Sequence, residues 1–320
     1  MIIQRILLMA TFTLALVPAA VRAEPKTTRI VVSFTSGGPV DSVARVLSEQ
    51  LGKELGRTVI VDNKPGANGA IGAVDVMKSA PDGGTLWFTS VGAAAVNPSL
   101  YEKLPYDMQR DFAPVSLVVN NVELLVTQQS NPARDAADFV AATKKRAEPV
   151  PMGSSGTGSI PHLAIEQLAD SSGAKLLHVP YKGAAPAITD LMGGQIGGFF
   201  GDVPGLLGHL QGGRLKALGV ASNKRHPALP DVKTLEEQGI RGVDTNNWYA
   251  LFAPAKTPPE VIEALSKAVR NTLANPGVRE KLLKTGTEPV GSTPQELAAI
   301  QKRDSEKWAK LIRAKNIKAE

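Results

Sequence analysis

Short apolar runs alternate with amphipathic stretches along most of the chain. The first run, residues 29–34, is followed by Gly37-Gly38 and by an amphipathic stretch that begins at Pro39. Proline suits the first turn of a helix, because its missing N–H would have no partner there anyway. The same pattern continues with residues 58–61, 70–79 and 84–90. Strands that alternate with helices predict an α/β layer with a mostly parallel sheet.

The remaining elements follow the same alternation, with a connection expected at residues 97–111. We expect strands at 112–117, 122–126, 176–179, 197–202, 215–221 and 248–254. We expect helices at 136–147, 259–274, 276–285 and 294–315, and further helices that begin near Pro161, Ala184 and Val203. The length of the chain then suits two domains. The first contains residues 24–123 plus 223–320, and the second contains residues 124–222.

Two turns rich in glycine and hydroxyl groups stand before helices in the two halves of the chain. The first turn is residues 35–38, and the second is residues 152–159. Taken alone, Gly37-Gly38 is more typical of a tight strand-to-helix connection. A helix start has unpaired N–H groups and the positive end of the macrodipole, and ligands of α/β sheets lie beyond the carboxyl ends of strands. Two such turns together predict an anion-binding cleft.

Residues 1–23 have the pattern of a secretory signal peptide. Arg5 is followed by an apolar stretch at 6–17 and by Val21-Arg22-Ala23, a small-x-small cleavage site, with cleavage after Ala20 as the alternative. The apolar stretch is shorter than the ~20 residues that span a bilayer. We therefore expect an exported, soluble mature protein.

Charge and composition exclude several classes of function. The chain has 36 Lys and Arg, 30 Asp and Glu, 5% aromatic residues and no cysteine. Nucleic-acid binding favours a basic stripe with stacking aromatics, whereas these basic residues are dispersed. Disulfides and thiolate metal sites are excluded. The net charge of +6, which becomes +4 without residues 1–23, favours small anions as ligands. We expect no nucleic-acid partner, no cofactor and no metal.

Ordered motifs extend over nearly the whole mature chain. They include Gly37-Gly38-x-x-Asp41-x-x-Ala44-Arg45, Asn63-Lys64-Pro65-Gly66-Ala67, Pro81-Asp82-Gly83-Gly84-Thr85-Leu86, His178-Val179-Pro180-Tyr181-Lys182-Gly183 and Leu229-Pro230-Asp231-Val232. In these motifs the chain resembles substrate-binding proteins of tripartite tricarboxylate transporters, the Bug or TctC-like family. The resemblance implies a periplasmic binding-protein fold (type II-like), with two domains that are each a mixed sheet flanked by helices. It also implies a monomer without enzymatic activity that delivers a small carboxylate to membrane permease subunits.

The resemblance also carries ligand contacts onto matching positions. In the first domain they are Thr35, Ser36, Gly37, Gly38, Asp41 and Ser90; in the second they are Ser154, Ser155, Gly156, Thr157, His162, Tyr181, Lys182, Gly183 and Asp202. Asp41 could instead hold the loop amides, and Lys182 could be a counter-ion or a plain loop lysine. Asp202 would suit an amine or hydroxyl of the ligand better than a carboxylate. His162 and Glu166 lie four residues apart, but two ligands are weak grounds for a metal site.

Other functions remain as alternatives. A carboxylate sensor that feeds a signalling system would have the same binding site. An exported serine hydrolase would need a base and an acid beside the serine, and the pattern Gly-x-Ser-x-Gly does not occur. A nucleotide-binding loop would end in Gly-Lys-Ser/Thr, which is absent. The ligand itself is open among dicarboxylates, tricarboxylates, acidic amino acids, nicotinate-like acids and aromatic acids.

Overall fold

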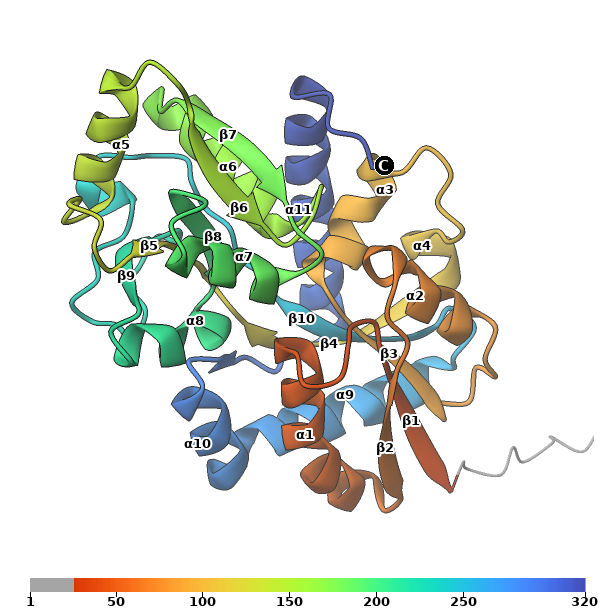
Figure 1. Cartoon of the computed structure of the whole chain (residues 1–320). Coiled ribbons are helices and arrows are strands. Elements are labelled where there is room, and N and C mark those ends of the chain that lie inside the picture. Colours follow the sequence, from red (N-terminus) through yellow and green to blue (C-terminus); the bar gives the residue numbers. More distant parts are fainter. Residues whose placement is uncertain (1–25, 320) are drawn as a thin grey trace, which may run out of the picture.

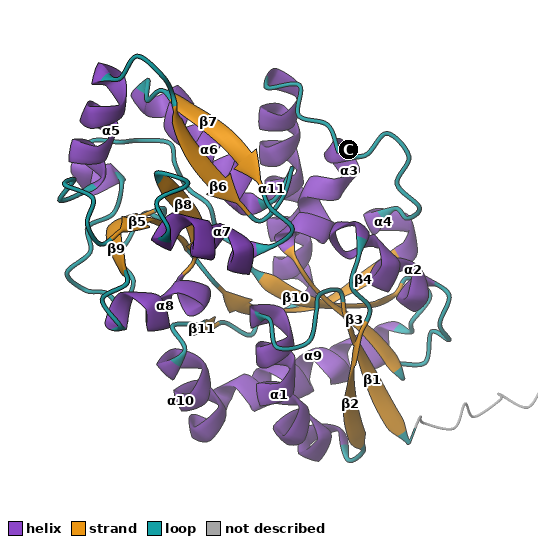
Figure 2. Ribbon diagram, viewed as in Figure 1, coloured by secondary structure: helices purple, strands orange, loops and turns teal. Residues whose placement is uncertain are grey.

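The computed structural model describes residues 26–319 and contains two β-sheets (Figure 1). The predicted signal peptide, residues 1–23, lies outside the described residues. The first sheet has six strands in the order β11-β4-β10-β3-β1-β2, and the second has five in the order β7-β6-β8-β5-β9. Helices flank both sheets (Figure 2).

The first sheet is mixed, so the expectation of a mostly parallel sheet is wrong. Its strands are β1 (Thr27–Val32), β2 (Thr58–Asn63), β3 (Thr85–Ser90), β4 (Phe112–Asn120), β10 (Tyr249–Pro254) and β11 (Glu288–Pro289). β1 pairs in parallel with β2 and β3, whereas β10 is antiparallel to β3 and β4, and β11 is antiparallel to β4. The reason is the route of the chain: β10 enters from the second sheet, while β4 leaves toward it.

Helices cover both faces of the first sheet. The helices on one face are α1 (Pro39–Leu55), α9 (Pro259–Ala274) and α10 (Pro276–Lys284). The elements on the other are α2 (Ala70–Met77), the π-helix η2 (Gly92–Val96), α3 (Asn97–Leu100) and α11 (Pro294–Ala314). Successive residues of β3 therefore enter two cores, with Phe88 packing on the first side and Trp87 on the second. Burial of both faces explains the continuous apolar run Leu86-Trp87-Phe88 in the middle of strand β3.

The predicted connection at 97–111 contains two short helices, α3 and α4 (Met108–Asp111). Asp107 caps α4, because its Oδ1 accepts hydrogen bonds from the N–H groups of Gln109 and Arg110 at 2.9 Å each. A turn η1 (Ala67–Gly69) precedes α2.

The second sheet is also mixed. Its strands are β5 (Glu123–Gln128), β6 (Val150–Ser154), β7 (Leu176–Pro180), β8 (Gly198–Asp202) and β9 (Leu215–Val220), and its helices are α5 (Ala136–Lys145), α6 (Ile160–Ser172), α7 (Ala184–Met192) and α8 (Val203–Gln211). The sequence analysis missed β6, because Pro151 and Gly153 made this stretch look like a loop. Gly153 packs closely against its neighbours: a Cβ there would lie 2.5 Å from Cδ1 of Ile196, so that side chain would have to move.

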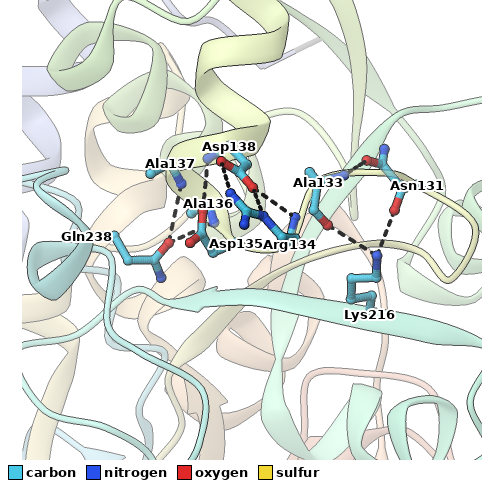
Figure 3. Close-up of polar contacts among 9 residues, drawn as sticks. All are labelled: Asn131, Ala133, Arg134, Asp135, Ala136, Ala137, Asp138, Lys216 and Gln238. Carbon is cyan, nitrogen blue, oxygen red and sulfur yellow. Dashed lines mark hydrogen bonds and ion pairs between the residues drawn. The ribbon is translucent and has the colours of Figure 1, made fainter.

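The start of α5 shows how the chain caps a helix that lies away from the cleft (Figure 3). Asp135 accepts a hydrogen bond from the N–H of Asp138 at 2.9 Å, and Oε1 of Gln238 accepts another from Ala136 at 2.7 Å. Lys216 donates to the carbonyl oxygen of Asn131 at 2.6 Å. The otherwise unpaired N–H groups of this helix are therefore used by the protein itself.

Two crossing segments join the sheets. One runs from β4 to β5 and the other enters β10, and they pair with each other: the N–H of Asn247 donates to the carbonyl oxygen of Asn121 at 2.7 Å. The sheets also share apolar packing, since Ile160 and Leu163 of α6 enter the same core as Leu100 of α3. The site described next lies where these connections meet.

Candidate functional site

A cavity of about 260 Å³ lies between the two sheets. The first sheet supplies the turn after β1, Ser90 at the end of β3, and the start of α1. The second supplies the starts of α6 and α7 and the end of β8. Asn247 comes from the crossing segment that enters β10, and Glu123 and Tyr249 are the first residues of β5 and β10, next to the crossing segments. The volume suits a small organic molecule, since sites for drug-sized ligands are typically ~300–1,000 Å³.

Two helices point uncapped N-termini at this cavity. The N-cap residues are Gly38 for α1 and Gly183 for α7, and neither end has a side-chain cap. Both glycines line the cavity. Gly183 has φ 109° and ψ 173°, a conformation that is essentially restricted to glycine. Unlike the capped start of α5, these ends keep N–H groups and positive dipole ends free to bind an anion.

Asp41 holds the turn at residues 35–38, before α1, in place. Its Oδ2 accepts hydrogen bonds from the N–H of Gly37 at 2.8 Å and from Nε of Arg45 at 2.9 Å, and its Oδ1 accepts from Nδ2 of Asn63 at 2.9 Å. Burial alone would raise the pKa of Asp41, but the bonds from Arg45, Gly37 and Asn63 lower it to about 2. Asp41 is buried and does not line the cavity, so its role in this structure is to shape the turn.

A stacked pair of histidines supports the glycine- and serine-rich loop. The rings of His162 and His178 have centroids 3.6 Å apart and lie within 7° of parallel. The N–H of Gly158 donates to Nδ1 of His162 at 3.0 Å, and Nε2 of His178 lies 2.6 Å from Oγ of Ser154. Burial and the neighbouring His162 lower the pKa of His178 to about 4. These contacts fix the loop, whose Ser155 and Ser159 line the cavity.

Ser154 and His178 form a serine–histidine pair of the kind that a serine hydrolase uses. Ser154 is fully buried and lies outside the cavity wall, so a substrate in the cavity does not reach its Oγ. The geometry therefore favours a role for Ser154 in holding the loop.

The structure divides the predicted site residues into two groups. Those that line the cavity are Thr35, Gly38, Ser90, Ser155, Gly183 and Asp202. Those that lie outside its wall are Ser36, Gly37, Asp41, Ser154, Gly156, Thr157, His162, Tyr181 and Lys182. Most of the second group shape the turns at residues 35–38 and 152–159 or the turn between β7 and α7. Tyr181, for example, donates from its hydroxyl to Oδ2 of Asp190 on α7 at 2.7 Å.

The sequence analysis missed the part of the site that lies beside the crossing segments. Glu123, Asn247 and Tyr249 line the cavity, as does Asn68 from the turn before α2. One signal for Glu123 was present: a carboxylate followed by the apolar run Leu124-Leu125-Val126 is costly to bury without a purpose. The other residues approach only through contacts that are distant in sequence.

Two carboxyl groups stand together in the cavity wall. Oε1 of Glu123 accepts a hydrogen bond from Nδ2 of Asn247 at 3.2 Å, and Oδ2 of Asp202 accepts one from the hydroxyl of Tyr249 at 2.6 Å. Burial, and then the charge of Asp202, raise the pKa of Glu123 well above its usual range. Burial also raises the pKa of Asp202. Among the described residues the wall contains no Lys, Arg or His.

The chain is similar to proteins of known family and known structure. Residues 43–317 match the sequence model of a family described as "Tripartite tricarboxylate transporter family receptor". The structure of the periplasmic binding protein BugD is 33% identical, with a TM-score of 0.82 over 92% of this chain and 99% of that one. Within residues 26–319, no helix has the length and apolarity needed to cross a membrane.

Two further solved structures were determined with a carboxylate ligand. An R. palustris protein solved with adipate is 32% identical, with a TM-score of 0.85 over 92% of this chain and 99% of that one. MatC from Rhodopseudomonas palustris, with bound malate, is 30% identical, with a TM-score of 0.80 over 90% of this chain and 99% of that one. The predicted fold class, an α/β periplasmic binding protein with two mixed sheets, is confirmed.

Proposed function

The chain belongs to the tripartite tricarboxylate transporter receptor family, and from that premise we propose that it captures a small organic carboxylate in the cavity between its sheets. The observation that carries the proposal is the pair of uncapped helix starts, Gly38 of α1 and Gly183 of α7, on one cavity of about 260 Å³. The solute-binding role itself follows from the family and its solved members.

In this mechanism the carboxylate accepts hydrogen bonds from backbone N–H groups at the two helix starts. Hydroxyl groups of Thr35, Ser90 and Ser155, which line the same cavity, add donors. Phe34 and Phe199 give the remainder of the ligand an apolar surface. Such a ligand contacts elements of both sheets, so it stabilises the closed arrangement by its higher affinity for that arrangement.

The two moving parts would be the predicted domains, residues 24–123 plus 223–320 and residues 124–222. The crossing segments around Asn121 and Asn247 would act as the hinge, because they are the described main-chain connections between the sheets. Hinge closure around a ligand is a common switching motion of binding proteins. We further propose a monomer in the periplasm whose closed form docks on membrane permease subunits.

A thermal-shift panel tests the proposal. Residues 24–320 are unfolded and refolded to remove any carried ligand, then heated with adipate, malate, succinate, citrate, aspartate, glutamate, nicotinate or benzoate. A ligand at ~100 times its Kd adds about 2.7 kcal/mol of stability, which is a readable shift in Tm. We expect at least one acid to raise Tm.

A pair of variants locates the binding. Ser155→Ala removes a hydroxyl from the cavity wall and should weaken the best acid about tenfold or more, since a hydrogen bond to a charged group contributes ~1.5–3 kcal/mol. The matched control is Ser171→Ala, which changes an exposed serine at the end of α6. The proposal is wrong if no acid stabilises the protein, or if both variants weaken binding equally.

A further inference from the structure

Two acidic side chains face each other in the wall of a cavity that we assign to an anionic ligand. Glu123 of β5 and Asp202 of β8 are direct partners in an antiparallel pair of strands. Such partners put their side chains on the same face of the sheet, with Cβ atoms ~4.5–5.5 Å apart, and like charges at these positions destabilise the pair. Both residues line the cavity, so that face is the one toward the ligand.

Glu123 carries an unused hydrogen-bond acceptor. The residue is 0% exposed, and its Oε2 has no hydrogen-bond partner among residues 26–319. Its other oxygen accepts from the neutral amide of Asn247. A buried acceptor without a partner costs ~1–3 kcal/mol, and more when it is charged. The protein therefore maintains an acceptor here that a ligand could use.

Asp202 is held by uncharged donors, namely the hydroxyl of Tyr249 and backbone N–H groups at the start of α8, of which Asp202 is the N-cap. Its Oδ2 accepts from the hydroxyl of Tyr249, a residue of the other sheet that also lines the cavity. The wall contains no Lys, Arg or His among the described residues. The two carboxyl groups thus face the cavity with hydrogen bonds from uncharged partners and without a protein cation to balance them.

We propose that Glu123 and Asp202 bind an ammonium group of the ligand, so that the preferred carboxylates of this receptor also carry an amine. The inference rests on the proposed function, since the helix starts of α1 and α7 hold the carboxylate end. An ammonium group has three N–H donors and a positive charge. It matches both the unused Oε2 of Glu123 and the repulsion between the two acids.

A bound proton is the alternative to an ammonium group for reducing the negative charge of Glu123 and Asp202. In the empty cavity, burial and mutual repulsion favour a proton on one of the two carboxyl groups. The side chains that face them are Asn247 and the hydroxyl of Tyr249, which carry no charge. Asp202 is also the N-cap of α8, where backbone N–H groups, including that of Gly205, lower its pKa against the effect of burial. An incoming ammonium group replaces the proton, which is released to solvent. An anion without an amine would instead require the proton to stay.

Neutralisation of the pair by an ammonium group and neutralisation by a proton predict opposite changes of ligand affinity with pH. The affinity for an amino acid should rise with pH as the shared proton becomes easier to lose, as long as the amine of the ligand stays protonated. The affinity for the same acid without its amine should fall with pH. Calorimetry in two buffers of different ionisation enthalpy reads the proton release directly.

Matched probes make the test sharp. The refolded chain, residues 24–320, is titrated with L-aspartate against succinate, L-glutamate against glutarate, L-leucine against 4-methylpentanoate, and L-phenylalanine against 3-phenylpropanoate. In at least one pair we expect the amino member to bind tenfold tighter or more at pH 8, with release of a proton. Glu123→Gln should remove that preference, because it keeps an acceptor for Asn247 and deletes the charge. Glu49→Gln, on the exposed face of α1, is the matched control and should retain the preference.

The outcomes separate the inference from the proposed function. If the acids without amines bind as tightly as their amino partners, the ammonium subsite is wrong and carboxylate capture stands. If no carboxylate of either series binds, the proposed function is wrong as well. If phenethylamine binds as tightly as L-phenylalanine, the carboxylate is not recognised. The proposed function is then wrong, whereas the ammonium subsite stands. Should Glu123→Gln not fold, Asp202→Asn tests the same charge, since its amide oxygen still accepts from Tyr249.

Discussion

Several buried side chains shape the candidate site by holding its turns in place, although they do not line the cavity themselves. Asp41 is the clearest case, because three donors on three different residues converge on one buried carboxylate below the first turn. The stacked rings of His162 and His178 do the same for the second turn. At the residue scale, the site is therefore a set of backbone amides held in place by buried polar side chains.

The first prediction concerns Asp41→Asn. The pKa of Asp41 is about 2 in the folded protein, below its ordinary 3.8, so its charge adds stability above pH 4 that is lost as pH falls toward 2. Arg45 is 52% exposed, so solvent weakens its share. We expect the variant to be less stable by about 1–2 kcal/mol at pH 7, and by clearly less at pH 3. Urea unfolding at the two pH values measures this; an equal loss at both would refute it.

Glu123→Gln should change stability in the opposite direction. The pKa of Glu123 is raised by burial and by Asp202, so its contribution is fully present below pH 4.5 and is lost as pH rises through the folded pKa. A tenfold change in an ionisation constant corresponds to about 1.4 kcal/mol. We expect the ligand-free variant to gain stability relative to the parent by on the order of 1 kcal/mol between pH 4 and pH 8. Thermal unfolding across that range checks it, and a pH-independent difference would count against it.

At the scale of elements, the starts of α1 and α7 differ from those of several other helices, including α6, which begins at the same cavity but is capped by Ser159. α5, α10 and α11 have side-chain caps from Asp135, Asn275 and Thr293. α1 and α7 begin instead at glycines that line the cavity and have no such cap. Leaving these ends uncapped gives up local stability, and the free N–H groups can then bind a ligand.

Gly183→Ala tests the start of α7. Gly183 has φ 109°, and a Cβ there would meet nothing within 4 Å, so the cost is purely one of backbone conformation. We expect a loss of about 1–3 kcal/mol in stability and weaker ligand binding. Gly208→Ala in α8 is the control: it also meets nothing within 4 Å but is helical, so it should gain about 0.5–1 kcal/mol. Denaturant unfolding and calorimetry measure both variants, and equal behaviour would contradict the prediction.

Most elements could be predicted from the sequence because proline and glycine mark their ends. The helix expected at 259–274 is observed as Pro259–Ala274, and that expected at 276–285 as Pro276–Lys284. β6 was missed because Pro151 and Gly153 hide a strand that tertiary packing stabilises. The cavity was only half predicted: its turns are local in sequence, whereas Glu123 and Asn247 meet across 124 positions. Patterns of neighbouring residues in the sequence do not predict a contact over that separation.

At the scale of the whole molecule, two sheets joined by crossing segments flank the candidate cavity, and the motion that we propose is hinge closure around it. Asn247 belongs to both the cavity wall and a crossing segment, and Glu123, which bonds to it, directly follows the other crossing segment at the start of β5. A ligand that contacts them would therefore act directly on the hinge. The closed population then depends on the difference in ligand affinity between the open and closed arrangements.

Energy transfer between two labels tests closure, and the absence of native cysteines makes specific labelling simple. Glu49→Cys on α1 and Glu148→Cys before β6 place exposed labels on the two sheet regions. A binding acid should increase transfer between them. Labels at Glu49→Cys and Lys256→Cys, both in the first region, should show no change. Unchanged transfer in the first pair at saturating ligand would exclude closure.

The most direct test of the central claim is a crystal structure of the refolded protein with the tightest acid of the panel. We predict electron density for that acid in the cavity, with a carboxylate oxygen ~2.7–3.2 Å from backbone N–H groups at the starts of α1 and α7. Density for the acid outside the cavity, or a carboxylate turned away from both helix starts, would contradict the account.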